Sequence, residues 1–457
     1  MNKAIIRDVV YPAYRALRRD RVLEHLAGMR RLQRAAPEDI RRMQWDKLRA
    51  LLEHASRHVP YYRKIFADLG ATPREIATPE HFSRFPVLRK ADIRANTDAL
   101  IAETRHADRL TREETGGSTG ENLSFYVDFL SGKTRLANNA VMNEWLGVRV
   151  GDRLAYLWGQ RFRETARERR IRAMKHWLSN TLYISAYRMD RESVRRHLAR
   201  LRRFKPDLVV GYPSALHHFC EEAVALGGCG FRPRAVLVSG ETVYDWQRAV
   251  IEQALGAPVY GHYGCCEFGA VARECNAHDG LHIAASRVLV EAGAAWGVED
   301  AAGASELVIT DLDNYGMPFI RYAIEDLGTV TWEPCACGMT LPRIRDLVGR
   351  VYDIVQAPNG NFLSGTFWGH VLKEGVQQFQ VVQEALDRIT IAIVPAGQFD
   401  DGARAYALDK IRQACGPEMQ VRFDVRQSIE PTRTGKHRYV ISKVALPASG
   451  AGGAERG

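Results

Sequence analysis

Alternating strand, turn and helix patterns between residues 207 and 260 constrain the fold more than any other feature. Strand-like runs at 207–210 and 234–238 are each followed by a polar turn and a helical segment, and another strand begins at 258. Parallel strands need helical crossovers of this kind. We therefore predict an α/β fold built on mixed or parallel sheets with flanking helices. Ligands are expected beyond the carboxyl ends of the strands.

The chain of 457 residues is too long for one small core and divides into two predicted domains. A large N-terminal domain spans 1–348 and begins with a helical lead-in over 1–75. A small, mobile α+β domain spans 349–446, and a small, polar tail at 447–457 is expected to be disordered. The elements predicted in the second domain are a hairpin over 353–362, strands at 378–384, 388–394 and 420–425, and a helix over 403–415.

A formal net charge of +10 invites a nucleic-acid interpretation. No recognised nucleic-acid-binding module accompanies the basic residues, so we expect a solvated basic face or attraction for anionic substrates instead. No apolar run approaches the ~20 residues that cross a bilayer. Charges at Lys3, Arg7 and Asp8 fall where a signal peptide needs its apolar segment, which favours a cytoplasmic location.

A glycine-rich segment over 115–121 is the first candidate binding motif. Its backbone N–H groups can surround an anion, and the hydroxyls of Ser118 and Thr119 add donors. The segment lacks the Lys-Ser/Thr ending of a Walker A loop. By itself, an ordinary surface turn is a better explanation of it than a phosphate site.

Four further segments strengthen the phosphate interpretation. Tyr263-Gly264 offers a ring for stacking on a base, and Glu267 offers a carboxylate for Mg²⁺. Asp326 can accept hydrogen bonds from ribose hydroxyls. Arg350 opens the second domain, and Lys436 lies in a turn near the end of the chain, where its ammonium could reach a reacting phosphate.

In this order and at these separations, the motifs resemble those of the adenylate-forming superfamily of acyl-CoA synthetases. More narrowly, they are similar to the phenylacetate–CoA ligase-like branch, which includes proteins associated with capsule biosynthesis. The resemblance extends from Trp45-Asp46-Lys47-Leu48 and His58-Val59-Pro60-Tyr61-Tyr62-Arg63 to Lys436.

The resemblance implies a role for each matching residue. Catalysis is assigned to Lys436 and Glu267, and Glu267 is also the implied Mg²⁺ ligand. The residues implied to bind the nucleotide are Thr115, Gly117, Ser118, Thr119, Gly120, Ser239, Gly240, Glu241, Tyr263, Gly264, Asp326 and Arg350.

The implied activity is that of an AMP-forming acid–thiol ligase. A carboxylic acid, aryl or acyl, would be activated with ATP and then transferred to CoA or to another thiol or amine. Two alternatives stay open: a nucleotide-binding scaffold without ligase activity, and an amide-forming ligase that does not use CoA. Neither the acid nor the oligomeric state follows from the sequence, which is compatible with a homodimer.

The sequence departs from the family pattern at three places. The glycine-rich segment ends Gly120-Glu121-Asn122, where relatives often have a proline. Cys265-Cys266 replaces a polar pair before the glutamate, and the stretch 321–326 lacks the usual Thr-Gly. These departures bear on rate and substrate more than on ATP binding.

A cysteine and histidine cluster predicts a metal site. Cys275 and His282 lie close in sequence, and Cys335 and Cys337 follow downstream. Three thiolates and one imidazole form a closed, structural zinc site, and some members of the family branch carry one. His278 is the alternative fourth ligand, and ordinary reduced cysteines are the alternative to a metal site.

Overall fold

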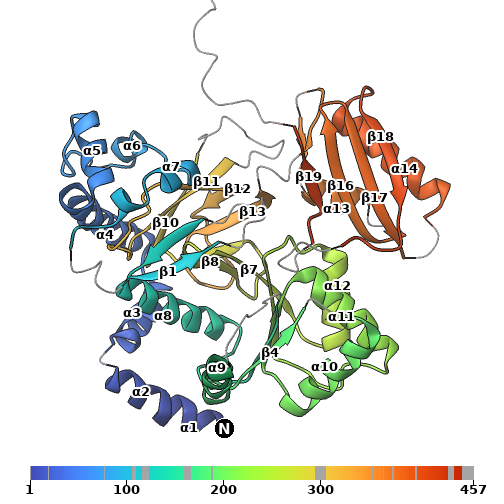
Figure 1. The fold of residues 1–457 in the computed structure, drawn as a ribbon, viewed down its shortest axis with the longest axis horizontal. Coiled ribbons are helices and arrows are strands. Elements are labelled where there is room, and N and C mark those ends of the chain that lie inside the picture. Colours follow the sequence, from blue (N-terminus) through green and yellow to red (C-terminus); the bar gives the residue numbers. More distant parts are fainter. Residues whose placement is uncertain are drawn as a thin grey trace, which may run out of the picture.

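The computed structural model describes residues 2–444, apart from 19, 77, 105–109, 116–122, 159–165, 187–188, 294–304, 351–354, 360, 364, 373–374, 397–398 and 431–436. Figure 1 shows a large body built around a central sheet, and a small sheet domain beside it. The predicted tail lies outside the described residues. So do all residues of the glycine-rich segment after Thr115, among them the candidates Gly117, Ser118, Thr119 and Gly120, and so does Lys436.

Eleven strands form the central sheet, in the order β10-β11-β12-β13-β9-β8-β7-β6-β5-β3-β4. The parallel half consists of β3 (Leu154–Trp158), β4 (Thr181–Ser185), β5 (Leu208–Gly211), β6 (Ala235–Ser239) and β7 (Val259–Cys265). The antiparallel half consists of β8 (Gly269–Glu274), β9 (Leu281–Ile283), β10 (Val288–Ala292), β11 (Ser305–Asp311), β12 (Tyr322–Thr331) and β13 (Arg343–Arg350). The predicted α/β class with a mixed sheet is confirmed.

Helices cover the parallel half because its strands are connected by crossovers. The helices on this half are α9 (Ala166–Leu178), α10 (Arg191–Phe204), α11 (Pro213–Ala225) and α12 (Asp245–Leu255). Helix α8 (Phe129–Trp145) packs against the antiparallel half, where Asn138 donates to the Ala270 carbonyl of β8. Helix α11 begins with a proline, whose missing N–H has no partner at that position in any case. Helix α12 ends before Gly256, which adopts the left-handed conformation that terminates helices.

Helices precede the sheet, as predicted for the first 75 residues. They are α1 (Lys3–Ile5), η1 (Ile6–Val10), α2 (Tyr11–Leu17), α3 (Val22–Leu32), α4 (Pro37–His58), α5 (Pro60–Leu69), α6 (Pro79–Ser83), α7 (Lys90–Ala95) and η2 (Asp98–Leu100). Two short strands follow as an antiparallel pair, β1 (Thr111–Glu114) and β2 (Ser124–Val127). Among the described residues, no helix combines the length and the apolar character that crossing a bilayer requires.

The small domain has its own four-stranded sheet, and its apolar core also includes Tyr244, at the start of α12 in the large domain. Its elements are the hairpin β14 (Val355–Gln356) and β15 (Phe362–Leu363), α13 (Gly365–Val371), β16 (Val376–Ala385), β17 (Arg388–Pro395), α14 (Asp401–Cys415), β18 (Gln420–Val425) and β19 (Val440–Ser442). The predicted hairpin, three strands and one helix are present. Helix α13 and strand β19 were not predicted. The boundary at residues 348 and 349 stays a prediction.

Candidate active site

A cavity of about 400 Å³ lies at the carboxyl ends of β6 and β7. Strand β6 ends at Ser239, and Gly240 turns the chain with a φ of 84°, a conformation that favours glycine. Five predicted nucleotide-binding residues line this cavity: Gly240, Glu241, Tyr263, Gly264 and Asp326. They come from the ends of β6 and β7 and from the middle of β12, so the fold brings together residues that are far apart in sequence. The two parallel strands place theirs at the carboxyl edge, as the ligand rule for such sheets expects.

Tyr263 and Asp326 form the central contact of the cavity. Tyr263 is on β7 and Asp326 is on β12, and the tyrosine hydroxyl donates a hydrogen bond of 2.8 Å to Oδ2 of the aspartate. Asp326 pairs directly with Arg350 in the register of β12 and β13. The backbone therefore sets the three predicted residues side by side.

Glu241 joins the large domain to the small one. Its carboxylate accepts hydrogen bonds from the Ser214 backbone N–H at 3.1 Å and from the Ser214 hydroxyl at 2.9 Å. It also accepts a hydrogen bond of 2.7 Å from the backbone N–H of His437. His437 directly follows Lys436, so a cavity-lining carboxylate holds the chain one residue away from the predicted catalytic lysine.

Glu267 is buried in the wall formed by β7, β8 and β12. Its Oε1 accepts a hydrogen bond of 3.0 Å from the hydroxyl of Tyr322, and Arg135 donates to its backbone oxygen. Burial raises the pKa of the neighbouring Cys265 thiol well above its usual value, so this cysteine is a neutral wall residue. The predicted Mg²⁺ role of Glu267 stays a prediction.

The glycine-rich segment connects β1 to β2, and Thr115 closes its base. Thr115 donates its backbone N–H to Leu123 O at 2.9 Å, and its hydroxyl accepts from Leu123 N–H at 2.9 Å. These two hydrogen bonds hold the end of the segment at Thr115 next to Leu123, where β2 is about to begin. A phosphate contact by the segment itself stays a prediction, because residues 116–122 lie outside the described part of the chain.

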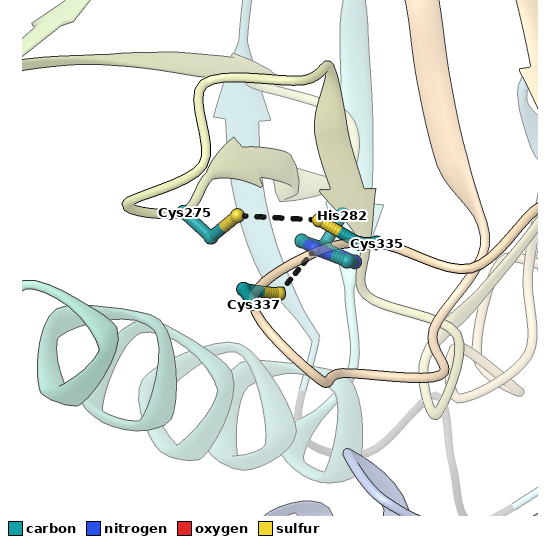
Figure 2. Close-up of side chains that lie close together, drawn as sticks. All are labelled: Cys275, His282, Cys335 and Cys337. Atoms are coloured by element: carbon teal, nitrogen blue, oxygen red, sulfur yellow. Dashed lines mark hydrogen bonds between the residues drawn. The ribbon is translucent and has the colours of Figure 1, made fainter.

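The cysteine cluster is assembled as predicted (Figure 2). The ligand atoms of Cys275, His282, Cys335 and Cys337 all lie within 4.8 Å of one another. The sulfurs of Cys275 and Cys335 are 3.7 Å apart, and Cys337 Sγ lies 3.3 Å from His282 Nε2. His282 Nδ1 is 3.2 Å from the Leu341 carbonyl, which fixes the tautomer that leaves Nε2 facing the sulfurs.

His278 is outside this cluster. Its ring stacks on Tyr260 with centroids 5.0 Å apart, and its Nδ1 lies 3.3 Å from Glu274 Oε2. His282 is therefore the histidine of the cluster. Burial raises the pKa of the Cys275 thiol to about 12 and lowers the pKa of His282 to about 4. A bound cation would have to displace thiol protons, while the imidazole is already neutral.

Several functional contacts had not been predicted from the sequence. Arg248 on α12 pairs with Glu274 at 3.0 Å, and both line the cavity. The Ser214 contact to Glu241 was also missed. Ser214 follows strand β5 at the carboxyl edge of the sheet, so the strand-end rule contained the signal that pointed to it. No local sequence pattern indicated that the backbone N–H of His437 would bind Glu241 across the domain boundary.

The chain is similar in sequence to one known domain family and to several characterised proteins. Residues 356–443 match the CapK C-terminal domain family. Protein CapK of Staphylococcus aureus is 23% identical over 415 residues, which cover 89% of this chain and 90% of the relative. Phenylacetate-coenzyme A ligase of Pseudomonas putida is 25% identical over 310 residues, which cover 65% and 68% of the two chains. The chain is a homologue of CapK and of the phenylacetate–coenzyme A ligases.

Solved structures share the same fold. A 2-hydroxyisobutyryl-CoA ligase in the postadenylation state with 2-HIB-AMP matches with a TM-score of 0.71 and 20% identity over 91% of both chains. The same ligase in its thioesterification state matches with a TM-score of 0.57 and 21% identity, covering 90% of this chain and 91% of the other. The fold of this CapK homologue is therefore that of the CoA ligases within the adenylate-forming superfamily.

Proposed function

We propose that this CapK homologue activates a carboxylic acid with ATP and transfers the acyl group to CoA or to another thiol or amine. The observation that carries the proposal is the Tyr263–Asp326 pair, which sets an aromatic ring and a carboxylate together on a cavity at the strand ends. Homology to phenylacetate–coenzyme A ligases supports it.

The nucleotide would be held from two sides of the cavity. The adenine would lie against the Tyr263 ring, beside Gly240 and Glu241. Asp326 has two carboxylate oxygens, so it can accept from a ribose hydroxyl while it accepts from Tyr263. The glycine-rich segment would hold the phosphates, and Arg350 would lie beside the ribose.

The proposed reaction has two steps. A carboxylate oxygen of the acid attacks the α-phosphorus of ATP, the bond to the β-phosphate oxygen breaks, and pyrophosphate leaves. The acceptor thiol or amine then attacks the acyl carbonyl, loses its proton, and AMP leaves. Mg²⁺, held by Glu267, would neutralise phosphate charge in the first step. The protein contributes orientation and charge stabilisation, with Lys436 beside the reacting phosphate.

We also propose that the cysteine cluster binds a structural zinc ion. Zinc–sulfur bonds of about 2.3 Å in a tetrahedron set neighbouring sulfurs about 3.8 Å apart, and the Cys275–Cys335 separation is 3.7 Å. Four protein ligands leave no open position, so the ion would hold together β8, β9 and the segment that carries Cys335 and Cys337. Elemental analysis of the purified protein should give one zinc per chain.

Pyrophosphate release with a panel of aryl and acyl acids tests the proposed activity. At least one acid should stimulate release, and Lys436→Ala should lower the adenylation rate by a hundredfold or more. Lys443→Ala, another lysine of the same domain, is the matched control and should keep the rate. Normal acyl-adenylate formation by Lys436→Ala would remove this lysine from the mechanism.

A further inference from the structure

Helix α9 exposes an apolar stripe flanked by basic residues. Ile171, Met174 and Leu178 recur at helical spacing, and Trp177 adjoins them with 63% of its surface exposed. Exposed clusters of large apolar side chains commonly mark interaction sites. Among the described side chains of the same helix, the exposed basic ones are Arg167, Arg170 and Lys175.

The N-terminal helices lie beside α9 in Figure 1, and they too expose large apolar side chains. Asn180, just after α9, donates to the Gly151 carbonyl at 2.8 Å, and a Cβ on Gly151 would meet the Lys3 carbonyl at 2.6 Å. Gly151 therefore contacts both the segment after α9 and helix α1. The large apolar side chains that η1, α2 and the end of α1 leave exposed are Ile5, Val9, Tyr14 and Leu17.

An arginine-rich cavity opens between these N-terminal helices and the sheet. It has a volume of about 590 Å³, and its charged lining consists of Arg7, Arg30, Arg149 and Arg234 with two carboxylates, Glu144 and Asp152. Three of these guanidinium groups are ion-paired: Arg7 with Asp8, Arg30 with Glu144, and Arg234 with Asp152. Among the described residues, no carboxylate forms an ion pair with Arg149. The cavity therefore carries a net positive charge next to the apolar side chains.

We use the name basal face for the surface that is formed by α1, η1, α2, α9 and this cavity. It lies at the edge of the sheet where β6 begins, since Arg234 precedes that strand. The candidate active site lies at the opposite edge, where β6 ends at Ser239. A partner on the basal face would therefore leave the catalytic cavity open.

We propose that the basal face binds the surface of a membrane that contains anionic lipids. Helices with apolar side chains and flanking arginines enter the headgroup region of bilayers, and each basic residue near an anionic surface strengthens binding. A second copy of the chain fits the face less well, because two positively charged faces repel each other. The inference does not depend on which acid the enzyme activates.

Flotation of the full chain with lipid vesicles tests this proposal. Vesicles of phosphatidylglycerol and phosphatidylcholine in equal amounts should bind the protein, and phosphatidylcholine alone should not. Salt should weaken binding, because it screens exposed charges. Arg167→Glu/Arg170→Glu should lower the affinity by tenfold or more. Arg404→Glu/Arg412→Glu changes two exposed arginines of the small domain by the same charge and should leave vesicle binding intact.

Trp177 reports whether α9 enters the bilayer. Brominated lipids should quench tryptophan fluorescence in the wild type and much less in Trp177→Phe, while acid-dependent pyrophosphate release and the melting temperature stay unchanged. Val425→Ser, equally exposed on β18, is the control for Met174→Ser, which should weaken binding. The proposal would be overturned if neutral vesicles bound the protein equally well. It would also be overturned if no vesicles bound it and light scattering showed a dimer that Trp177→Ser disrupts.

Discussion

Tyr62 shows what the motif at residues 58–63, part of the family resemblance, does in the structure. Its hydroxyl donates to the Pro318 carbonyl at 3.0 Å and accepts from the Ile320 N–H at 3.1 Å, and only 1% of the residue is exposed. Pro60 starts the short helix that carries the tyrosine. The motif therefore fastens a helix to the segment that leads into β12, the strand that carries Asp326.

Replacing Tyr62 with phenylalanine should destabilise the fold. The substitution leaves a buried carbonyl and a buried N–H without their partner, which costs about 1–3 kcal/mol. Urea unfolding should show this loss as a lower midpoint. Tyr61→Phe is the matched control, because Tyr61 is only half-buried, and its stability should stay within about 0.5 kcal/mol of wild type. Equal midpoints for the two variants would contradict this structural role.

The Tyr263–Asp326 pair should control nucleotide affinity. Asp326→Ala removes the only carboxylate that the proposal assigns to the ribose, so the KM for ATP should rise tenfold or more. Tyr263→Phe keeps the ring and loses one hydrogen bond, so its effect should be a few-fold. Initial-rate kinetics at saturating acid measure both effects. An unchanged KM in Asp326→Ala would remove the ribose role of this residue.

At the scale of elements, the cysteine cluster ties together parts of the antiparallel half. Cys275 follows β8, His282 is on β9, and Cys335 and Cys337 lie between β12 and β13. These connections have no crossover helix to brace them. A structural ion would replace that support.

Removal of the proposed zinc should loosen this half of the sheet. Cys335→Ser should abolish stoichiometric zinc and lower the melting temperature by several degrees, since losing a structural metal is among the larger single destabilisations. Cys266→Ser changes an exposed cysteine outside the cluster and should keep one zinc per chain. A full zinc content in Cys335→Ser would contradict the assigned ligand set.

The sequence predicted individual elements better than their arrangement. The helical segment predicted after the strand at 234–238 corresponds to α12, because Gly256 and Pro258 terminate that helix locally. The antiparallel half could not be predicted strand by strand, because β13 pairs with β9 across about 60 residues and no local pattern encodes that pairing. The members of the cysteine cluster could be predicted because cysteine and histidine side chains are typical metal ligands, whereas Arg248 resembles an ordinary surface residue of a helix.

For the whole molecule, the contact between the domains combines apolar packing with hydrogen bonds, since Tyr244 of the large domain belongs to the apolar core of the small one. Tyr439 of the small domain accepts a hydrogen bond of 2.7 Å from Gln247 on α12, and its ring lies edge-on to Tyr244 at 5.0 Å. The hydrogen bond from the His437 backbone N–H to Glu241 also joins the two domains. An interface of this kind suits a domain that changes position between two half-reactions.

Weakening this interface should slow one half-reaction more than the other. Tyr439→Phe removes the hydrogen bond to Gln247, and a loss of about 1 kcal/mol should slow adenylation about fivefold. Thioester formation from added acyl-adenylate should change little. Tyr406→Phe alters an exposed tyrosine of the same domain and should affect neither step. Equal slowing of both steps by Tyr439→Phe would assign the contact to stability alone.

Acid-dependent exchange of labelled pyrophosphate into ATP is the decisive measurement for the proposed activity, because only reversible acyl-adenylate formation produces it. We predict exchange with at least one acid of a broad panel, without any CoA, and a loss of a hundredfold or more in Lys436→Ala. Tight ATP binding with no exchange for any acid would contradict the proposed adenylation and would instead support a nucleotide-binding scaffold without ligase activity.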